Sequence, residues 1–239
     1  MANDFFQFRQ FTISQQRCAM KVGTDGTLLG AWAKSYGQWK TNILDIGTGT
    51  GLIALMMAQR YPEAMVKAID IDSEAVAQAR ENVAASPFAN RVEVLQADID
   101  AFECDDRFDA IVCNPPYFPA DHSMESPDLQ RRMARQTHSL NFQTLVHAVK
   151  RLLAPEGLFS VVIPVDGYHM MATEALQVSL YVSRLCHIRT TPRKEPKRLL
   201  IEFCQTPVNK IDMSEGIIEI EPNIRSPWYQ EMTQDFYIR

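Results

Sequence analysis

The sequence predicts an α/β fold in which a mostly parallel sheet of seven strands, the last of them antiparallel, carries helices on both faces. Short apolar runs rich in β-branched residues alternate with segments of helical periodicity, which is the order expected of strand–helix–strand units. The final two strands are too close in sequence for a helical crossover, so we expect them to pair antiparallel. The predicted strands are 42–46, 65–72, 91–96, 108–113, 158–164, 182–189 and 198–204.

Five helical segments complete this arrangement. The predicted helices are 27–34, 52–60, 74–85, 142–153 and 167–179. Thr24 or Asp25 is a suitable N-cap for the first helix, because short polar side chains accept hydrogen bonds from the free N–H groups at a helix start. We expect residues 1–239 to form one domain, with 1–35 as an N-terminal arm and helix and 205–239 as a C-terminal extension packed on the rest.

Composition indicates an intracellular globular protein. Of the 239 residues, 46% are hydrophobic, which is enough for a sizeable core, and the net charge is −5. The five cysteines are scattered without a Cys-x-x-Cys pair, which predicts reduced thiols rather than disulfides or a zinc site. The sequence contains neither a signal peptide nor an apolar run of membrane-spanning length, so we expect a cytoplasmic protein without a membrane partner.

The fourth predicted strand, 108–113, ends in a rigid corner. Pro115 and Pro116 cannot extend the strand, because proline has no backbone N–H to donate, and they restrict the backbone around them. Ligands of open α/β sheets bind at such carboxyl ends. Asn114 offers a side-chain carbonyl, Pro115 a backbone carbonyl and Tyr117 an aromatic face, a combination that suits a flat ring with an exocyclic amino group. The alternative is an ordinary strand-ending turn, since Asn and Pro are common turn residues.

A glycine-rich loop follows the first predicted strand. Gly47, Gly49 and Gly51 alternate with threonines, and glycine lets the chain turn tightly and lets a ligand lie directly on the backbone. Their spacing differs from the Gly-x-Gly-x-x-Gly pattern of dinucleotide-binding proteins. Asp45, just ahead of the loop, would repel a pyrophosphate and suit a cofactor with a cationic end. Taken alone, the loop is also consistent with a simple strand-to-helix turn.

Two further strands end in acidic residues. Asp70 lies about 20 residues beyond the glycine loop, where a carboxylate can accept both hydroxyls of a ribose, and Ile71 follows it directly. Asp72 or Ser73 is the expected cap of the next helix. Asp98 follows the third strand, where it can accept from the amino group of an adenine while Ile99 packs on the ring. Four consecutive strands therefore end in groups that suit a nucleoside-containing cofactor.

This succession of motifs resembles the class I methyltransferases, which use S-adenosylmethionine to methylate exocyclic or amide nitrogens. A resemblance to one family, the bacterial tRNA(Val) adenine-37 N6-methyltransferases, covers nearly the whole chain and is carried most specifically by residues 17–26, 28–33 and 233–237. The resemblance implies a Rossmann-like fold, S-adenosylmethionine as the cofactor and tRNA as the substrate. It also implies that the N-terminal segment containing Lys21, Gly23 and Thr24 folds over the cofactor.

The resemblance implies a mechanism that fits the residues. The amino lone pair of adenine is delocalised into the ring, so the nitrogen is a poor nucleophile. If Asn114 Oδ1 and the Pro115 carbonyl accept both N–H bonds, the planar form is disfavoured and the lone pair points at the methyl carbon, while Tyr117 stacks on the base. The displaced proton can leave to water, so neither a strong base nor a metal is expected. The five histidines lack metal-ligand spacing: His122, His138, His147, His169 and His187.

The net charge of −5 is unfavourable for a nucleic-acid partner, so binding of RNA would depend on a local cluster of basic residues. Between Arg184 and Arg198, six basic residues on a predicted hairpin are opposed only by Glu195. A long irregular segment, 118–137, contains three more arginines, and loops of this length are usually functional or disordered. The expected RNA-binding residues are Arg131, Arg132, Arg135, Arg189, Arg193, Lys194, Lys197 and Arg198. The alternative is a solvated charged hairpin.

Other functions fit the sequence less well. Glutamine methyltransferases that act on protein factors share the Asn-Pro-Pro-Tyr motif but carry a helical domain before the glycine loop, whereas only 44 residues precede Asp45. A DNA adenine methyltransferase would need a target-recognition domain, and a nicotinamide-dependent dehydrogenase would need a different glycine spacing. A non-catalytic nucleotide- or RNA-binding module predicts the loss of a strand-end group, and none is lost. The sequence indicates no obligate protein partner.

Overall fold

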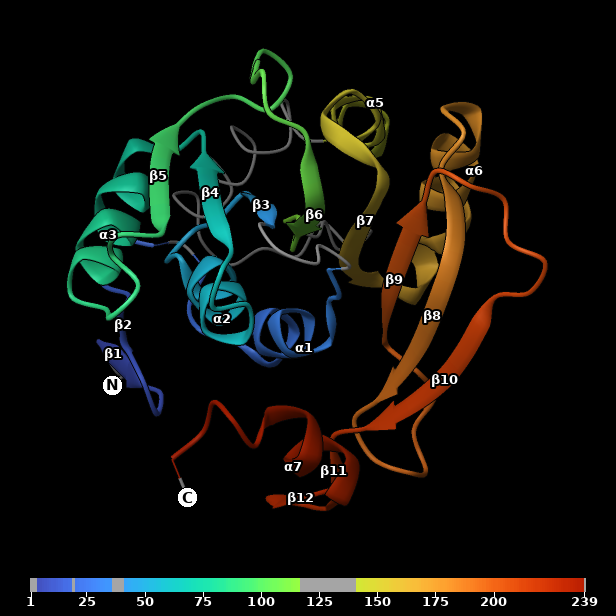
Figure 1. The fold of residues 1–239 in the computed structure, drawn as a ribbon. Coiled ribbons are helices and arrows are strands. Elements are labelled where there is room, and N and C mark those ends of the chain that lie inside the picture. The colour runs from blue at the N-terminus through green and yellow to red at the C-terminus, as the bar shows by residue number, and fades with distance from the viewer. Residues whose placement is uncertain (1–3, 19, 36–40, 117–140, 239) are drawn as a thin grey trace, which may run out of the picture.

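The computed structural model describes residues 4–18, 20–35, 41–116 and 141–238, and its centre is a sheet of eight strands (Figure 1). Along the sheet the strands follow the order β10-β8-β9-β7-β6-β3-β4-β5. The strands are β3 (Asn42–Ile46), β4 (Met65–Asp70), β5 (Val92–Gln96), β6 (Phe108–Cys113), β7 (Leu153–Pro164), β8 (Tyr181–Arg189), β9 (Arg198–Cys204) and β10 (Asp212–Ile217).

The strand directions confirm the predicted fold class. The five strands from β5 to β7 run parallel, and β9 is antiparallel to both of its neighbours, β7 and β8. The predicted count of seven strands was too low, because β10 adds a further strand parallel to β8. Four of the six residues of β10 are exposed, so this edge strand lacks the apolar run by which buried strands are identified.

Helices cover both faces of the sheet (Figure 1). They are α1 (Thr24–Trp32), α2 (Leu52–Arg60) and α3 (Ser73–Ala84) on one face, and α5 (Phe142–Leu152), the short 3₁₀ helix η1 (Val165–Gly167) and α6 (Tyr168–Gln177) on the other. Side chains of β6 alternate between the two cores: Ala110 and Val112 pack toward α1 and α2, and Ile111 and Cys113 toward α5. Burial on both faces is the reason why this strand is apolar throughout.

The starts of two helices test the predicted caps. The prediction for α1 was wrong: Gly23 occupies the N-cap position and no side chain caps the helix, so neither Thr24 nor Asp25 has this role. Of the two predicted caps of α3, Asp72 is confirmed and Ser73 is the first residue of the helix: Asp72 Oδ1 accepts a hydrogen bond of 2.9 Å from the N–H of Glu74.

The two ends of the described chain pack against each other. The N-terminal hairpin of β1 (Phe5–Gln7) and β2 (Thr12–Ser14) is fixed to α3, because the N–H of Ser14 donates to Asn82 Oδ1 across 2.9 Å. The N–H of Arg9 donates to the carbonyl of Phe236 across 2.8 Å. The ring of Tyr237 stacks on Phe8, so an aromatic cluster joins both ends of the chain.

The C-terminal extension contacts the main sheet and α1. It contains β10, the hairpin of β11 (Glu219–Glu221) and β12 (Ile224–Arg225), and helix α7 (Pro227–Thr233). A Cβ atom at Gly216 of β10 would overlap the ring of Trp228, so the absence of a side chain lets α7 lie against the sheet edge. Helix α7 also contacts α1.

Candidate active site

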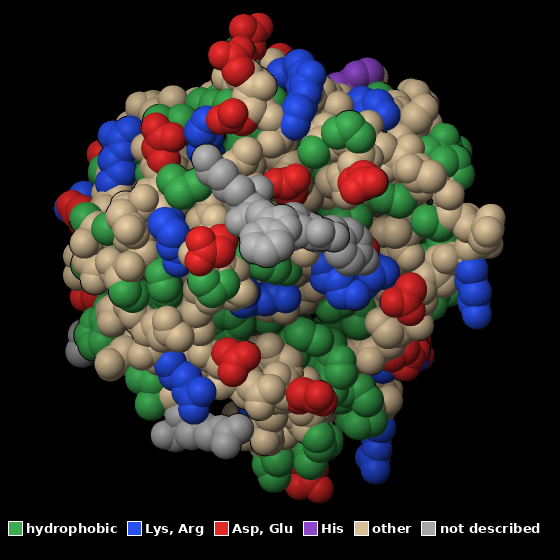
Figure 2. All heavy atoms as spheres, in the orientation of Figure 1, with side chains coloured by type: hydrophobic (Ala, Val, Ile, Leu, Met, Phe, Trp, Pro, Cys, Tyr) green, Lys and Arg blue, Asp and Glu red, His purple; other side chains and the backbone are tan. Residues whose placement is uncertain are grey.

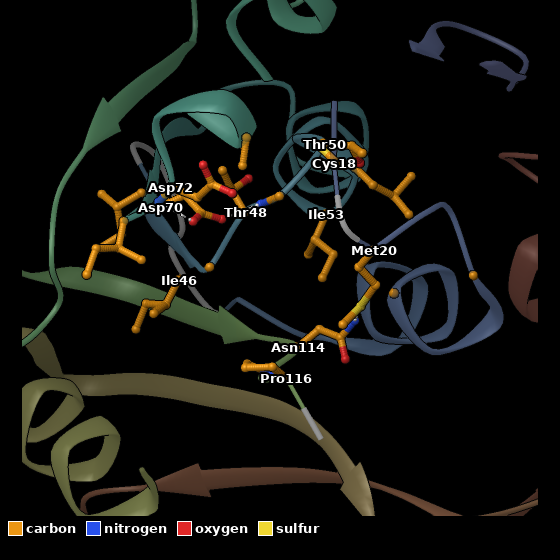
Figure 3. Close-up of a pocket in the computed structure, with 18 of the residues that line it drawn as sticks. Cys18, Met20, Ile46, Thr48, Thr50, Ile53, Asp70, Asp72, Asn114 and Pro116 are labelled. Atoms are coloured by element: carbon orange, nitrogen blue, oxygen red, sulfur yellow. Dashed lines mark hydrogen bonds between the residues drawn. The ribbon is translucent and has the colours of Figure 1, made fainter. Parts of the chain in front are cut away.

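A cavity of about 460 Å³ lies at the carboxyl ends of β3, β4 and β6, beside the segment that precedes α1 (Figure 3). Its volume is that of a typical small-molecule site, and its position is the one at which open α/β sheets bind ligands. Ten of the predicted residues line it: Lys21, Gly23, Thr24, Gly47, Gly49, Asp70, Ile71, Asp98, Ile99 and Asn114.

The glycine loop presents bare backbone to this cavity. Gly47 and Gly49 have φ angles of +69° and +55°, and a Cβ atom at either position would meet no atom within 4 Å. Glycine is therefore required by the backbone conformation, and the space that a side chain would occupy stays open for a ligand. Gly51 has a different role: its Cβ would lie 3.4 Å from that of Ala79, so this glycine allows close packing on α3 and does not line the cavity.

Asp45 lies beneath the loop and not in the cavity wall. Its carboxylate is fully buried, and Oδ2 accepts hydrogen bonds from Thr48 Oγ1 at 2.6 Å and from the N–H of Ala54 at 3.1 Å. These bonds tie the glycine loop to α2. Oδ1 has no hydrogen-bond partner within the described part of the chain. Burial raises the pKa of Asp45 to about 7, because the ionised form is poorly solvated there.

Asp70 joins the end of β4 to the glycine loop. Its Oδ2 accepts from the N–H of Gly49 at 2.9 Å, and its Oδ1 accepts from the N–H of Asp72 at 3.0 Å. Burial raises the pKa of Asp70, while the backbone hydrogen bonds lower it. Each carboxylate oxygen has more than one lone pair, so the side chain is held in place and can still accept from a ligand.

Asn114 extends from β6 toward the segment before α1. Its Nδ2 donates to the sulfur of Met20 at 3.6 Å, and both side chains line the cavity (Figure 3). Pro115 is buried and is absent from the cavity lining, whereas Pro116 lines it. Tyr117, predicted to stack on the substrate, lies outside the described residues.

Sequence reasoning missed Met20 and Cys18 as parts of this cavity. Both belong to the N-terminal segment that carries the family resemblance, and this resemblance could have identified them as cavity residues. Burial raises the pKa of Cys18 to about 12, with a further contribution from the negative charges of Asp70 and Asp72. The thiol is therefore protonated at neutral pH and is a wall residue rather than a nucleophile.

The cavity wall is acidic. Among its lining side chains, Lys21 is the only basic one in the described residues, whereas the carboxylates of Asp25, Asp70, Asp72 and Asp98 all contribute. Such a wall favours a ligand with a positive charge.

The predicted basic hairpin lies at the same edge of the sheet as Asn114, because β8 ends and β9 begins there. Its charges are opposed by more acids than the sequence suggested. Arg189 pairs with Glu215 at 3.4 Å and lies 3.9 Å from Glu195. Arg198 pairs with Asp25 at 2.9 Å. Glu195 is the one acid within the hairpin stretch, and Glu215 and Asp25 oppose its charges from other elements.

Arg184, counted with the hairpin in the sequence, is mostly buried, with 13% of its side chain exposed. Its guanidinium pairs with the buried Glu202 at 2.8 Å and lies 3.9 Å from the centre of the Trp32 ring. Three predicted RNA-binding residues are exposed: Arg193, Lys194 and Lys197. Three others lie outside the described residues: Arg131, Arg132 and Arg135.

Residues 4–18, 20–35, 41–116 and 141–238 contain no group of three or more His, Cys, Asp or Glu side chains placed to hold a metal ion. In the same ranges, every helix is too short or too polar to cross a lipid bilayer.

Comparisons with known proteins agree with this geometry. Residues 27–180 match the family described as the methyltransferase small domain. A curated tRNA1(Val) (adenine(37)-N6)-methyltransferase from Phocaeicola vulgatus is 49% identical, and the match covers 100% of this chain and 99% of that protein. A protein of the same description from Bacteroides thetaiotaomicron is 47% identical over 100% of this chain and 99% of its own length.

Solved structures share the fold at much lower identity. A predicted O-methyltransferase from Agrobacterium tumefaciens superimposes with a TM-score of 0.65 at 18% identity, covering 89% of this chain and 96% of that one. The glycopeptide N-methyltransferase MtfA complexed with S-adenosylmethionine gives a TM-score of 0.55 at 14% identity, covering 78% and 90%. With a family match over most of its length and close relatives over all of it, the chain belongs to the tRNA1(Val) (adenine(37)-N6)-methyltransferase family.

Proposed function

We propose that the protein transfers a methyl group from S-adenosylmethionine to the exocyclic N6 of an adenine in the tRNA anticodon loop, position 37 of tRNA1(Val). One observation carries the proposal beyond family membership: Asn114 lines the same cavity as Asp70 and the bare glycine loop. A group that can hold an adenine amino nitrogen thus lies beside groups that can hold a nucleoside cofactor.

Different residues of the cavity bind different parts of the cofactor. Asp70, fixed by two backbone N–H groups, accepts from the ribose hydroxyls. Ile71 and Ile99 flank the adenine ring, and Asp98 accepts from its amino group. Gly47 and Gly49, with Lys21, Gly23 and Thr24 of the opposite wall, enclose the amino-acid end. S-adenosylmethionine supplies an electrophilic methyl group on a positively charged sulfur, and the acidic wall is compatible with that charge.

Asp45 and Gly51 support the cofactor site indirectly. Asp45 holds the glycine loop through Thr48 and Ala54, and Gly51 lets that loop pack on α3. Both residues were predicted to bind the cofactor, and we assign them the shaping of the loop.

The substrate nitrogen is activated by hydrogen-bond acceptors. Asn114 Oδ1 and the carbonyl of Pro115 accept the two N–H bonds of the adenine amino group, which disfavours its planar form and directs the lone pair at the methyl carbon. Tyr117 stacks on the base. The proton is lost to water after transfer, so the site needs no strong base. Because position 37 lies inside a folded loop, the base must be turned out of its stack to reach this cavity.

The basic hairpin is the best-supported RNA contact. Arg193, Lys194 and Lys197 are exposed beside the active-site edge and can contact phosphates. Figure 2 shows basic and acidic side chains interspersed over the face that it draws, so an RNA site on this protein depends on local clusters rather than on one extended positive field. Arg131, Arg132 and Arg135 remain predicted contacts.

The proposal also concerns the domain organisation, the location in the cell and the partners that catalysis needs. The contacts of β10 with β8 and of α7 with α1 support a single methyltransferase domain over residues 1–239. A tRNA substrate implies that the protein works in the cytoplasm. We propose that catalysis needs neither a metal ion nor an obligate protein partner.

The test is a labelling experiment with three substrate pools. The purified protein and its Asn114→Ala variant are incubated with radiolabelled S-adenosylmethionine and, separately, with tRNA, DNA and cell protein. The proposal expects label in tRNA as N6-methyladenine, abolished by the substitution. Label in protein would favour the glutamine methyltransferase, and the absence of label from every pool would favour the non-catalytic binding module.

A further inference from the structure

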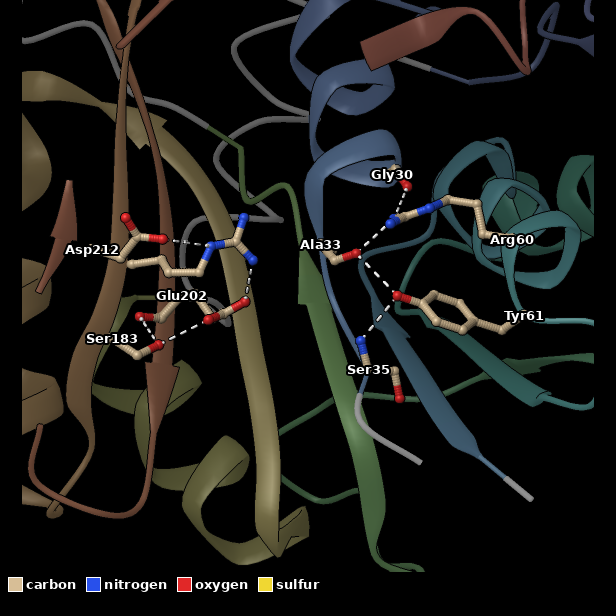
Figure 4. A network of polar contacts seen from close by, with 9 residues as sticks. Gly30, Ala33, Ser35, Arg60, Tyr61, Ser183, Glu202 and Asp212 are labelled. Atoms are coloured by element: carbon tan, nitrogen blue, oxygen red, sulfur yellow. Dashed lines mark hydrogen bonds and ion pairs between the residues drawn. The ribbon is translucent and has the colours of Figure 1, made fainter. Parts of the chain in front are cut away.

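Helix α1 has two ends of different character. From Gly26 to Trp32 every residue is buried, and Arg60 fixes the C-terminal end by donating to the carbonyls of Gly30 at 2.8 Å and Ala33 at 2.6 Å (Figure 4). This part of the helix is held by packing and by charge-assisted hydrogen bonds.

Residues 20–26, which comprise the segment before α1 and the start of its first turn, are held less firmly. Met20, Lys21 and Gly23 are exposed, yet all three line the cofactor cavity. Among the described residues, polar contacts join this segment to other elements at three of its positions: the N–H of Val22 donates to Gln15 Oε1 at 2.8 Å, Asn114 donates to Met20, and Asp25 pairs with Arg198.

The Asp25–Arg198 pair is the only contact among these that joins two charged groups. Arg198 Nε lies 2.9 Å from Asp25 Oδ2, and the side chains are 34% and 29% exposed, so solvent screens the pair only in part. The two residues are 173 positions apart and connect the start of β9 to the first turn of α1. Arg198 also donates to the carbonyl of Lys197, which fixes the guanidinium at the sheet edge.

We propose that Arg198 is a positioning residue for the cofactor: through Asp25 it holds residues 20–26 against the cavity, and it does not serve as a phosphate contact. The sequence placed Arg198 in the RNA-binding cluster because neighbouring positions are basic. In the fold its guanidinium is engaged by a carboxylate of the cavity wall, whereas Arg193 at the hairpin tip is exposed. The inference rests on the proposed function only in taking S-adenosylmethionine as the cavity's ligand.

A purely electrostatic role makes a different prediction. Arg198 partly neutralises Asp25, so its removal would leave the wall more negative and would attract a cationic ligand more strongly. S-adenosylmethionine has a net positive charge and S-adenosylhomocysteine is neutral overall. If Arg198 positions residues 20–26, its removal should weaken the binding of both ligands alike. If Arg198 only neutralises Asp25, its removal should strengthen the binding of S-adenosylmethionine alone.

The experiment measures three dissociation constants for wild type, Arg198→Ala and the matched control Arg193→Ala, together with their melting temperatures. For Arg198→Ala we expect the Kd of both S-adenosylmethionine and S-adenosylhomocysteine to rise about fivefold, the size of a partly buried ion pair, with tRNA affinity in the absence of cofactor unchanged. For Arg193→Ala we expect unchanged Kd values for both cofactor ligands and a weaker affinity for tRNA. Arg198→Lys, which keeps the charge and lowers the risk of misfolding, should give an intermediate cofactor affinity.

A double-mutant cycle with Asp25→Asn completes the test. If the ion pair carries the effect, the double variant Asp25→Asn/Arg198→Ala binds cofactor no more weakly than the worse single variant. Additive losses, a tighter S-adenosylmethionine complex, or a loss confined to tRNA affinity would each overturn the proposal. If the wild type binds cofactor but does not methylate tRNA, the proposed function is contradicted. The cofactor dissociation constants of the variants would still test the role of Arg198.

Discussion

The side-chain amide of Asn114 donates to the sulfur of Met20 across 3.6 Å, joining the end of β6 to the segment before α1. A thioether accepts hydrogen bonds and cannot donate them, so this contact selects the amide orientation in which nitrogen faces Met20. Figure 3 shows the oxygen of Asn114 directed away from the methionine. Met20 therefore helps to present the acceptor on which activation of the substrate nitrogen depends.

Replacing Met20 with leucine should lower kcat about fivefold and change the Kd of S-adenosylmethionine less than twofold. Leucine keeps the bulk of the side chain and removes the acceptor, and a single hydrogen bond contributes about 1 kcal/mol. Steady-state kinetics with tRNA and calorimetric cofactor titration separate the two effects. Met65→Leu is the matched control, because Met65 is also about half exposed but lies at the far end of β4. An unchanged kcat for Met20→Leu would show that the sulfur contact has no role.

Replacing Asp70 with alanine should raise the Kd of S-adenosylmethionine at least tenfold. The change removes the ribose acceptor and also the partner of the Gly49 N–H, so the glycine loop loses its fixed position. Asp72→Asn is the control, because asparagine is an equally good helix cap and leaves Asp70 intact, so this variant loses only one wall charge. Equal losses in the two variants, measured by calorimetry, would contradict the role assigned to Asp70.

The buried carboxyl of Asp45 should make stability depend on pH. Its folded-state pKa is raised to about 7, above the value of about 4 in an unfolded chain. Between these values the folded state binds more protons than the unfolded state, so the free energy of unfolding falls as pH rises from about 4 to about 7.

Asp45→Asn removes this titration and keeps an oxygen for Thr48 and Ala54. Its free energy of unfolding, measured with urea, should therefore increase relative to wild type between pH 4.5 and pH 7.5, by an amount on the order of a few kcal/mol. A difference between the two proteins that stays constant over this range would mean that Asp45 is ionised throughout.

Reversing the charge of Arg193 and Lys194 to glutamate should weaken tRNA binding at least tenfold and leave cofactor affinity unchanged. Both side chains are exposed at the hairpin tip, and each lost phosphate contact also reduces the salt dependence of binding. Lys210→Glu, an exposed lysine in the connection between β9 and β10 at the opposite edge of the sheet, is the control. An unaltered tRNA affinity in the hairpin variant would exclude this surface.

Local chemistry explains which features the sequence could predict. The strand β6 is buried on both faces, so its apolar run identifies it, and Asp72 caps α3 through a hydrogen bond to a residue two positions away. The residues at the ends of β3, β4, β5 and β6 converge because parallel strands bring their carboxyl ends to one edge.

The features that sequence reasoning missed depend on distant partners or on polar positions. Asp25, one of the two candidate caps of α1, pairs instead with Arg198, and Asn114 contacts Met20 across 94 positions. No local pattern encodes either pairing. The strand β10 was missed because it lies at the sheet edge with mostly exposed side chains, so hydrogen bonding to β8 rather than burial defines it.

The proposed activity is tested most directly by methylation of two tRNA1(Val) transcripts that differ only at position 37. The wild-type protein is incubated with S-adenosylmethionine and either the transcript with adenine 37 or one with guanine there, and nucleosides are quantified by mass spectrometry. We expect about one N6-methyladenosine per adenine-37 transcript and none in the guanine transcript, with product formation lost in Asn114→Ala. Equal methylation of both transcripts, or full activity of the Asn114 variant, would contradict it.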